Sequence, residues 1–551
     1  MKQWTFITLS LLLLASACKK SDSSGNTGGG TFSYRSTLVN GINNGTNSYS
    51  NTSTNPTIKI SFSEPINRSA TASNVFFKEG SNAVDFSLAY ENNDSIVVVK
   101  PNASLKAFTS YSVIVAFTIK SVAGNQLANS LTVSLQTGID STNKFPTITD
   151  DSLLTLVQKQ TFKYFWDFGH PNSGMARERN TSGDVIATGG SGFGIMAIVT
   201  GISRNFITRS EGLTRLQKIV AFLKTAKTWH GAFPHWINGN TGATVPFSTK
   251  DDGADLVETS YLMQGLLTAR QYFSNADAAE TTLRTDITNL YNAVEWSWFR
   301  KSNENVLYWH WSSTYNWDMN LKIQGWNEGL MTYVLGASST TYGVPKAAYT
   351  EGWARNGAMV NGSSFYGITL PLGNAYGGPL FFTHYSFMGI NPTGLTDTYA
   401  NYWQQNVAHA KINYNYCKTN PNNYYGYSEQ CWGLTASDIP SGYTASSPTN
   451  DVGVIAPTAA LASFPYTPAE SMAALKFFYY KLGDRIWKDY GFTDAFSLKD
   501  QWFASSYLAI DQGPIIVMIE NYRTGLLWNL FMSNPEVKTG MKSLGFQSPN
   551  L

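Results

Sequence analysis

Between residues 32 and 138, apolar and polar positions alternate along the chain. Ile58, Ile60 and Phe62 are separated by single polar residues, which is the two-residue period of a strand with one buried face. Further strands of this kind are predicted over residues 96–99, 111–117 and 131–135. Short strands at this spacing predict an all-β sandwich over residues 32–138.

From residue 151 onwards the apolar positions follow a helical period instead. Leu153, Leu154 and Val157 begin the first apolar helix face after a linker at 139–150. Further helices are predicted within residues 192–202, 213–226, 255–273, 278–299, 325–335, 399–416, 469–482 and 514–532. Long segments rich in Gly, Asn, Tyr and Trp separate some of them, and long loops in a compact domain usually carry function. We expect residues 151–551 to form an all-α (α/α)6 toroid, in which loops and inner helix ends surround a cleft.

The first residues have the pattern of an export signal. Lys2 precedes an apolar run at 6–14 and small residues at 15–17, so residues 1–17 are predicted to be a signal peptide. Cys18 follows directly, as in a bacterial lipobox, although Ala15 stands where Leu is usual. We expect lipid attachment at Cys18, a flexible tether over 18–31 and an exported outer-membrane lipoprotein. Plain secretion is the alternative.

Composition narrows the classes of partner. The net charge is +2, from 39 basic and 37 acidic residues, which gives no overall field for nucleic acid. Aromatic residues make up 14% of the chain, and they fit either a large core or a sugar site with aromatic walls. Apart from Cys18 there are only Cys417 and Cys431, either a disulfide or two buried thiols. No metal-binding spacing is present, so neither metal nor cofactor is expected.

One group of acidic residues lies at the start of the predicted helix at 255–273. If that helix begins near Asp251, then Asp251, Asp255 and Glu258 fall on one face. Because burying unpaired charge is costly, such a stripe should point into a solvated cavity. The alternative is that acids near a helix start simply cap it and complement its dipole.

Two further carboxyls are candidates for chemistry. Glu328 follows Trp326 and an aromatic stretch at 308–317, surroundings that would raise its pKa toward that of a general acid. Asp511 precedes Pro514, expected in the first turn of an apolar helix, so Asp511 either caps that helix or acts in catalysis. Arg523, in the same helix, could fix a carboxylate or bind a sugar hydroxyl.

The segment at 424–438 combines aromatic and acidic residues. Tyr427, Glu429 and Trp432 are predicted to contact a sugar, although a Tyr-rich loop packed on itself is the alternative. The six His residues are scattered and are either structural or sugar contacts, and we count His384 among the latter.

Several of these stretches together resemble one enzyme family, glycoside hydrolase family 144, whose domain is also called glycoamylase-like. The resemblance rests on residues 252–259, 325–328, 377–381, 427–438 and 511–514. It implies an (α/α)6 barrel that hydrolyses β-1,2-glucan or its sophoro-oligosaccharides with inversion, without a cofactor. It also implies Glu328 as general acid and Asp511 as general base, with Asp251, Asp255 and Glu258 lining the cleft. The segments at 62–66 and 121–127 resemble bacterial Ig-like modules, which we interpret as a spacer.

Two other function classes remain open from the residues alone. A polysaccharide lyase could use the same toroid, but lyases of uronate polymers need cationic groups, and the candidate site is acidic. A non-catalytic glycan-binding lipoprotein would keep the aromatic residues without needing Glu328 and Asp511. Endo and exo action are equally open. We expect a monomer with a β-glucan as its partner, attached to the membrane only through lipid, and no nucleic acid.

Overall fold

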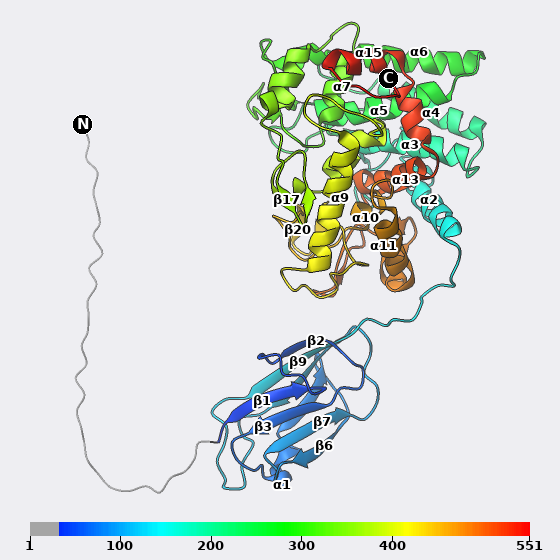
Figure 1. The fold of residues 1–551 in the computed structure, drawn as a ribbon. Coiled ribbons are helices and arrows are strands. Elements are labelled where there is room, and N and C mark those ends of the chain that lie inside the picture. The colour runs from blue at the N-terminus through cyan, green and yellow to red at the C-terminus, as the bar shows by residue number, and fades with distance from the viewer. Residues whose placement is uncertain (1–31) are drawn as a thin grey trace, which may run out of the picture. The chain divides into compact units, whose positions relative to one another are not determined.

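The computed structural model describes residues 32–551, which form two compact units that divide after Ile139 (Figure 1). The predicted signal peptide at 1–17, Cys18 and the tether at 18–31 lie outside the described residues. Within 32–551, no helix combines the length and the apolar character that a bilayer crossing requires.

The first unit is a sandwich of two sheets, as the alternating pattern predicted. One sheet has the order β1 (Tyr34–Val39), β3 (Ile58–Phe62), β7 (Ile96–Pro101), β6 (Phe86–Glu91). The other has the order β2 (Ser48–Thr52), β9 (Leu131–Thr137), β8 (Ser110–Val115), β4 (Val75–Glu79), β5 (Asn82–Ala83). Only β2 and β9 pair in parallel among these strands, and a short helix, α1 (Arg68–Thr71), precedes β4.

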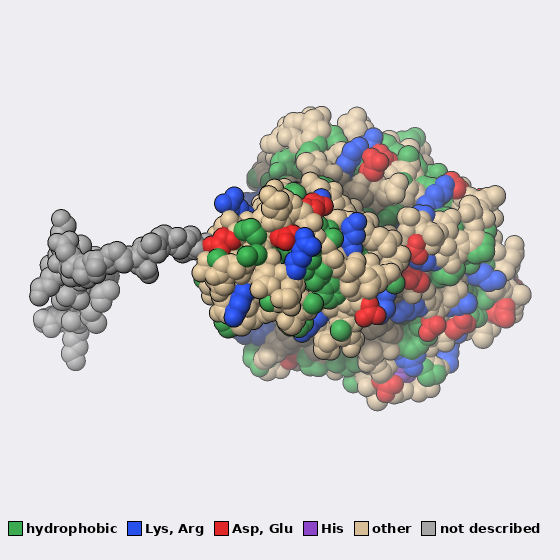
Figure 2. All heavy atoms as spheres, turned by 90° about the horizontal axis from the view of Figure 1, so that it is seen from below, with side chains coloured by type: hydrophobic (Ala, Val, Ile, Leu, Met, Phe, Trp, Pro, Cys, Tyr) green, Lys and Arg blue, Asp and Glu red, His purple; other side chains and the backbone are tan. Residues whose placement is uncertain are grey.

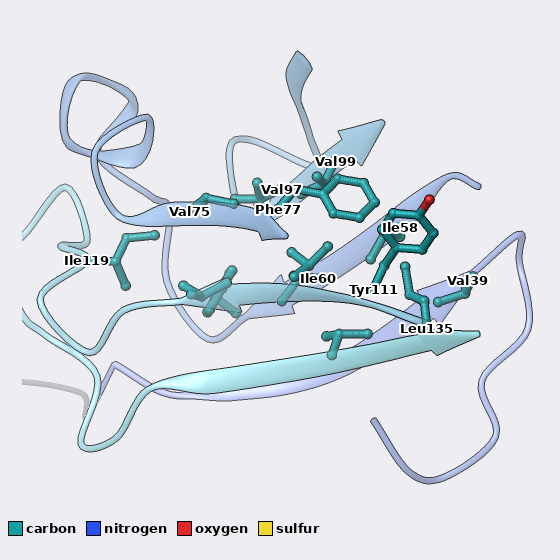
Figure 3. Close-up of a cluster of buried hydrophobic side chains, with 14 of the residues drawn as sticks. Val39, Ile58, Ile60, Val75, Phe77, Val97, Val99, Tyr111, Ile119 and Leu135 are labelled. Atoms are coloured by element: carbon teal, nitrogen blue, oxygen red, sulfur yellow. The ribbon is translucent and has the colours of Figure 1, made fainter. Parts of the chain in front are cut away.

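The core of this unit confirms the predicted strand face. Ile58, Ile60 and Phe62 are buried in one cluster, while Lys59 and Ser61 between them are partly exposed. In the close-up, Ile60 and Phe77 lie between the strands of the two sheets (Figure 3). In β3 the period of two therefore buries one face and leaves the other partly exposed.

The second unit is the expected helical toroid. Its inner helices are mostly buried: α3 (Thr188–Ser203), α5 (Leu256–Tyr272), α7 (Leu330–Ser338), α10 (Pro457–Leu461) and α13 (Ala509–Thr524), together with the half-buried α8 (Phe381–His384). Amphipathic outer helices surround them: α2 (Asp150–Trp166), α4 (Arg209–Leu223), α6 (Ala278–Asn292), α9 (Tyr402–Thr419) and α11 (Pro468–Tyr480). Shorter helices complete the unit: α12 (Gly483–Ile486), α14 (Leu526–Met532) and α15 (Pro535–Leu544). Figure 1 shows α3, α5 and α13 stacked within this unit.

Two helix starts decide how the candidate carboxyls are arranged. Helix α5 begins at Leu256 rather than near Asp251, and Asp255 is its N-cap, accepting a hydrogen bond from the Glu258 amide at 2.9 Å. The three acids therefore do not form a stripe along one helix. Helix α13 begins at Ala509, so Pro514 lies inside it and Asp511 lies in its first turn rather than capping it. The helix predicted over 514–532 is two helices, because Gly525 has φ +70° between α13 and α14.

Close packing of α3 against α5 fixes the floor of the toroid's cleft. A Cβ atom on Gly192 would lie 2.1 Å from the Tyr261 carbonyl oxygen, and one on Gly265 would lie 2.1 Å from the Gly192 carbonyl oxygen. Only glycine allows the two backbones to approach this closely. The same crossing brings the Gly189 amide of α3 to the Glu258 carboxylate of α5, at 2.7 Å.

The long loops of the helical unit contain short paired strands. The segment at 417–466 includes a hairpin of β19 (Ala436–Ile439) and β20 (Gly442–Ala445). A later pair is β23 (Phe496–Ser497) with β24 (Trp502–Phe503). These strands were missed because two to four residues cannot show a reliable period.

Candidate active site

A pocket of about 450 Å³ lies among inner-helix ends and loops of the helical unit. Its walls are mainly aromatic, and the rings come from segments far apart in the chain: His235, Trp236, Phe247, Tyr261, Trp309, Phe381, Tyr385 and Tyr443. Among the polar residues that line it are Glu178, Arg179, Glu258 and Glu328. Aromatic walls with a few polar groups suit a ligand that has apolar faces and hydroxyl edges, as a sugar has.

Two carboxyl side chains, Glu258 and Glu328, line this pocket. Glu258 belongs to α5, and Glu328 lies in the turn before α7. The hydroxyl of Tyr261 donates to the Glu328 backbone carbonyl at 3.1 Å and fixes the turn. Burial raises the pKa of both carboxyls to about 7, and the negative charge of Asp255 adds to the effect. Each carboxyl can therefore hold a proton near neutral pH, as a general acid must.

Asp511 lies just behind the pocket wall. Its side chain is buried, while its neighbours Leu508 and Ile510 line the pocket. No amide or hydroxyl donor among the described residues reaches either of its carboxyl oxygens. Burial raises the pKa of Asp511 well above its usual range, and the charge of Asp494 raises it further.

Asp494 is a buried carboxyl that the sequence analysis missed. It lies between β22 (Gly491–Phe492) and β23, and its Oδ2 accepts the Asp438 amide at 2.7 Å. Burial raises its pKa to about 7, and its charge is coupled to that of Asp511. The negative charge of Asp494 thus makes ionisation of Asp511 less favourable still. Nothing in the residues around Asp494 distinguishes it in the sequence.

Tyr385 connects Glu328 with Asp511. Its ring lines the pocket, and burial raises the pKa of its hydroxyl, with the charges of Asp511 and Glu328 adding to that rise. Glu328 and Asp511 therefore lie near the same tyrosine, although they are far apart in the chain. Glu328 precedes α7, whereas Asp511 belongs to α13.

Asp251 and Asp255 form a cluster with two imidazoles beside the pocket. His235 Nδ1 lies 2.9 Å from Asp255 Oδ2, and His310 Nε2 lies 3.2 Å from Asp251 Oδ2 and 3.5 Å from Asp255 Oδ2. Burial opposes charge on both rings, but the surrounding carboxylates outweigh it and raise the pKa of each imidazole to about 9. Two imidazolium ions thus balance two buried carboxylates, and the pKa of Asp255 is held well below its usual range.

The same cluster has the donor atoms of a cation site. One ligand atom each of His235, Asp251 and Asp255 lies within 4.8 Å of the others. The direct contacts between imidazole and carboxylate balance the charges when the rings are protonated, although Asp251 Oδ1 and His310 Nδ1 have no hydrogen-bond partner among the described residues. Charge balance is therefore reached by the ion pairs themselves.

Most of the other predicted sugar contacts do not line the pocket. Tyr427 donates to Asp451 at 2.8 Å, Trp432 is fully buried, and Glu429 lies on the surface 3.4 Å from Lys418. These three side chains of the segment at 424–438 therefore contact other parts of the chain or solvent and not the pocket. Only its end reaches the pocket, through Ala436.

Three remaining candidates have structural contacts. Arg523 reaches outward from α13 and pairs with Asp151 of α2 at 2.6 Å. His384 is buried against Ser463 at 3.0 Å, and burial lowers its pKa to about 3, so it is neutral. Trp326 is buried with its ring 6.0 Å from that of Phe387.

Cys417 and Cys431 are free, buried thiols rather than a disulfide. Burial raises the pKa of both, so neither is an ionised nucleophile.

Two family models match the chain. Residues 320–535 match the model described as "Putative glucoamylase", and residues 43–137 match "Bacterial Ig-like domain". These ranges fall within the helical unit and the sandwich respectively.

Known relatives are similar over the helical unit. The chain is 49% identical over 420 residues to the exo beta-1,2-glucooligosaccharide sophorohydrolase (non-reducing end) of Parabacteroides distasonis, covering 72% of this chain but only 58% of that enzyme. A crystal structure named as a putative glucoamylase from Bacteroides uniformis is 56% identical, with a TM-score of 0.73, over 74% of this chain and 100% of its own. The endo-beta-1,2-glucanase of Chitinophaga pinensis, solved with sophorotriose and glucose, is 51% identical, with a TM-score of 0.72, over 74% and 100%.

The imidazole cluster predicts how stability depends on pH. His235 and His310 have a pKa of about 9 in the folded chain, against 6.5 ordinarily, so unfolding above pH 6.5 releases protons. We expect the unfolding free energy to fall between pH 7 and 9, by up to about 1.4 kcal/mol per pH unit for each ring. Denaturant unfolding at pH 7, 8 and 9 measures this slope.

The His310→Asn variant should show a shallower slope over the same range. His170→Asn is the control, because burial lowers the pKa of His170 and its titration ends below this window. Equal slopes in the wild type and in His310→Asn would show that the ring is not an imidazolium in the folded chain.

Proposed function

Because this chain belongs to glycoside hydrolase family 144, the glycoamylase-like β-1,2-glucanases, we propose that its helical unit hydrolyses β-1,2-glucan or sophoro-oligosaccharides. The proposal is carried by one observation: Glu328, with its pKa raised to about 7, lines an aromatic pocket near a second buried acid, Asp511. The relatives named for β-1,2-linked substrates support the choice of linkage.

In the proposed reaction, the pocket rings hold glucosyl units by stacking on their C–H faces. Glu328 is protonated near neutral pH and donates its proton to the departing glycosidic oxygen. Glu258 lines the same pocket, and its charge adds to the rise in the pKa of Glu328. The cluster of His235, His310, Asp251 and Asp255 is neutral overall and supports the pocket from the side of α5.

Asp511 acts as the general base in this proposal. It takes a proton from a water molecule that attacks the anomeric carbon from the face opposite the leaving group, which inverts the configuration. A base must be ionised, yet burial disfavours charge on Asp511. The neighbouring charge of Asp494 also disfavours ionised Asp511, so Asp511 acts as a base only in the fraction of molecules in which it has lost its proton.

We also propose export and lipid attachment, supported by the sequence pattern at 1–18. Lipid on Cys18 would tether the sandwich and the hydrolase unit to the outer membrane, with the Ig-like module as a spacer. We propose that the chain acts as a monomer. On the face shown in Figure 2, acidic and basic side chains are interspersed, which fits a neutral glycan better than a polyanion.

Replacing either catalytic carboxyl should abolish turnover of β-1,2-glucan. We expect Glu328→Gln and Asp511→Asn each to lower kcat by at least about 100-fold, measured as new reducing ends. Glu429→Gln is the matched control, because Glu429 lies on the surface, and it should keep wild-type activity. Full activity in both site variants would refute the assignment.

The products of the wild type distinguish the function classes. Sophorose or glucose supports hydrolysis, and sophorose alone indicates exo action, whereas a range of oligosaccharides indicates endo action. Unsaturated products would indicate a lyase, and binding without turnover would indicate a glycan-binding protein.

The pH dependence of kcat/KM tests the coupling of Asp494 to Asp511. In the wild type, kcat/KM should fall above pH 7 as Glu328 loses its proton. In Asp494→Asn, the pKa of Asp511 should fall because a neighbouring negative charge is removed, so the acidic limb should move to lower pH. Asp500→Asn, a change in the same segment at a carboxylate paired with Lys499, is the control. An unmoved acidic limb in Asp494→Asn would contradict the coupling.

Lipid attachment predicts a simple change in fractionation. Expressed in a Gram-negative host, the wild type should sediment with membranes, while Cys18→Ser should be recovered in the soluble fraction. Recovery of both forms in the soluble fraction would exclude the anchor.

A further inference from the structure

A second hollow, of about 590 Å³, adjoins the catalytic pocket. Two residues, Arg179 and Tyr443, line both spaces. Tyr443 lies on β20, so the β19–β20 hairpin forms part of the wall between them. The remaining lining comes from the segments at 180–181, 438–442 and 502–506.

Trp502 is a large aromatic side chain in the lining of this hollow, which also includes the half-exposed Tyr443. It lies on β24 next to Phe503, and adjacent residues of a strand point to opposite faces. The Phe503 ring already packs on Phe496, with ring centres 6.3 Å apart and planes at 21°. Trp502 is partly exposed and lines the hollow, so its ring offers a flat apolar surface there.

The polar groups of the hollow are balanced in charge. Arg179 lies 3.2 Å from Asp438 and 3.0 Å from Glu178, so its guanidinium is already paired with carboxylates. Asn180 holds the lining segment in place by donating to the Ser505 carbonyl at 3.1 Å. An anion would find no free positive charge among these groups, whereas a neutral polyhydroxylated ring would find both hydrogen-bonding groups and a stacking surface.

From this arrangement we propose that the hollow binds glucosyl units of the same β-1,2-glucan chain, beyond those held in the catalytic pocket, with Trp502 as the stacking platform. The inference rests on the proposed function. Arg179 and Tyr443 line both the pocket and the hollow, so a glucan chain that leaves the pocket on this side would pass them. Preference for longer chains then follows, because only they reach both spaces.

The experiment compares Trp502→Ala with the wild type on a series of purified sophoro-oligosaccharides of increasing length. We expect the loss in kcat/KM to grow with chain length and to reach about tenfold for the longest chains, the effect of losing one aromatic stacking contact. Trp502→Phe keeps a ring and should restore most of the loss. Tyr522→Ala is the control, because Tyr522 is an exposed aromatic residue toward the other end of α13 from Asp511.

A second variant does not depend on Trp502. Ser505 is exposed at the rim, so Ser505→Trp should obstruct the hollow and reproduce the loss that depends on chain length. Binding of long oligosaccharides to Glu328→Gln, with and without Trp502→Ala, gives the same comparison without turnover.

Losses of equal size at every chain length, or no loss in either Trp502→Ala or Ser505→Trp, would overturn the proposal. Failure of the proposed function would look different, because the wild type itself would then release no product from any of these oligosaccharides.

Discussion

The cost of burying negative charge governs the helical unit of this protein. Carboxyls from α5 and from the turn before α7 line one pocket of aromatic rings, and Asp511 of α13 is buried next to residues of its wall with Asp494 beside it. In such surroundings each must be neutralised, paired or hydrogen-bonded. Some carboxyls of this region are paired with imidazolium ions, whereas others have a raised pKa and hold a proton. These differences underlie the separate chemical roles that we propose for them.

On the side of α5, the solution is pairing with imidazolium. His235 and His310 keep Asp255 ionised at low pH, and Asp255 in turn caps α5 through the Glu258 amide. At Glu328 and Asp511 burial dominates, and at Asp511 the charge of Arg179 offsets it only in part, so the pKa of each rises. The contrast separates fixed charges beside the pocket from the carboxyls for which we propose proton exchange during a reaction.

The hairpin β19–β20 connects this chemistry with substrate binding. The side chain of Asp438, on β19, forms an ion pair with Arg179. Its backbone amide donates a hydrogen bond to Asp494. Tyr443, on β20, lines both the catalytic pocket and the adjoining hollow. A short pair of strands within a long loop thus joins the coupled aspartates to the path proposed for the glucan chain.

The sequence by itself determined the class of both units and several site residues. Periods of two and of 3.6 fix which faces are buried, and this predicted the sandwich and the helical toroid. Glu258 and Glu328 were identified because acids beside apolar and aromatic residues are unusual, and both line the pocket. Only the tertiary structure decided that Asp494 meets Asp511, that His310 joins Asp251, and that Arg523 faces away toward Asp151. Those outcomes depend on the approach of segments distant in the chain, and neither local period nor composition encodes which buried charge will lie opposite which partner.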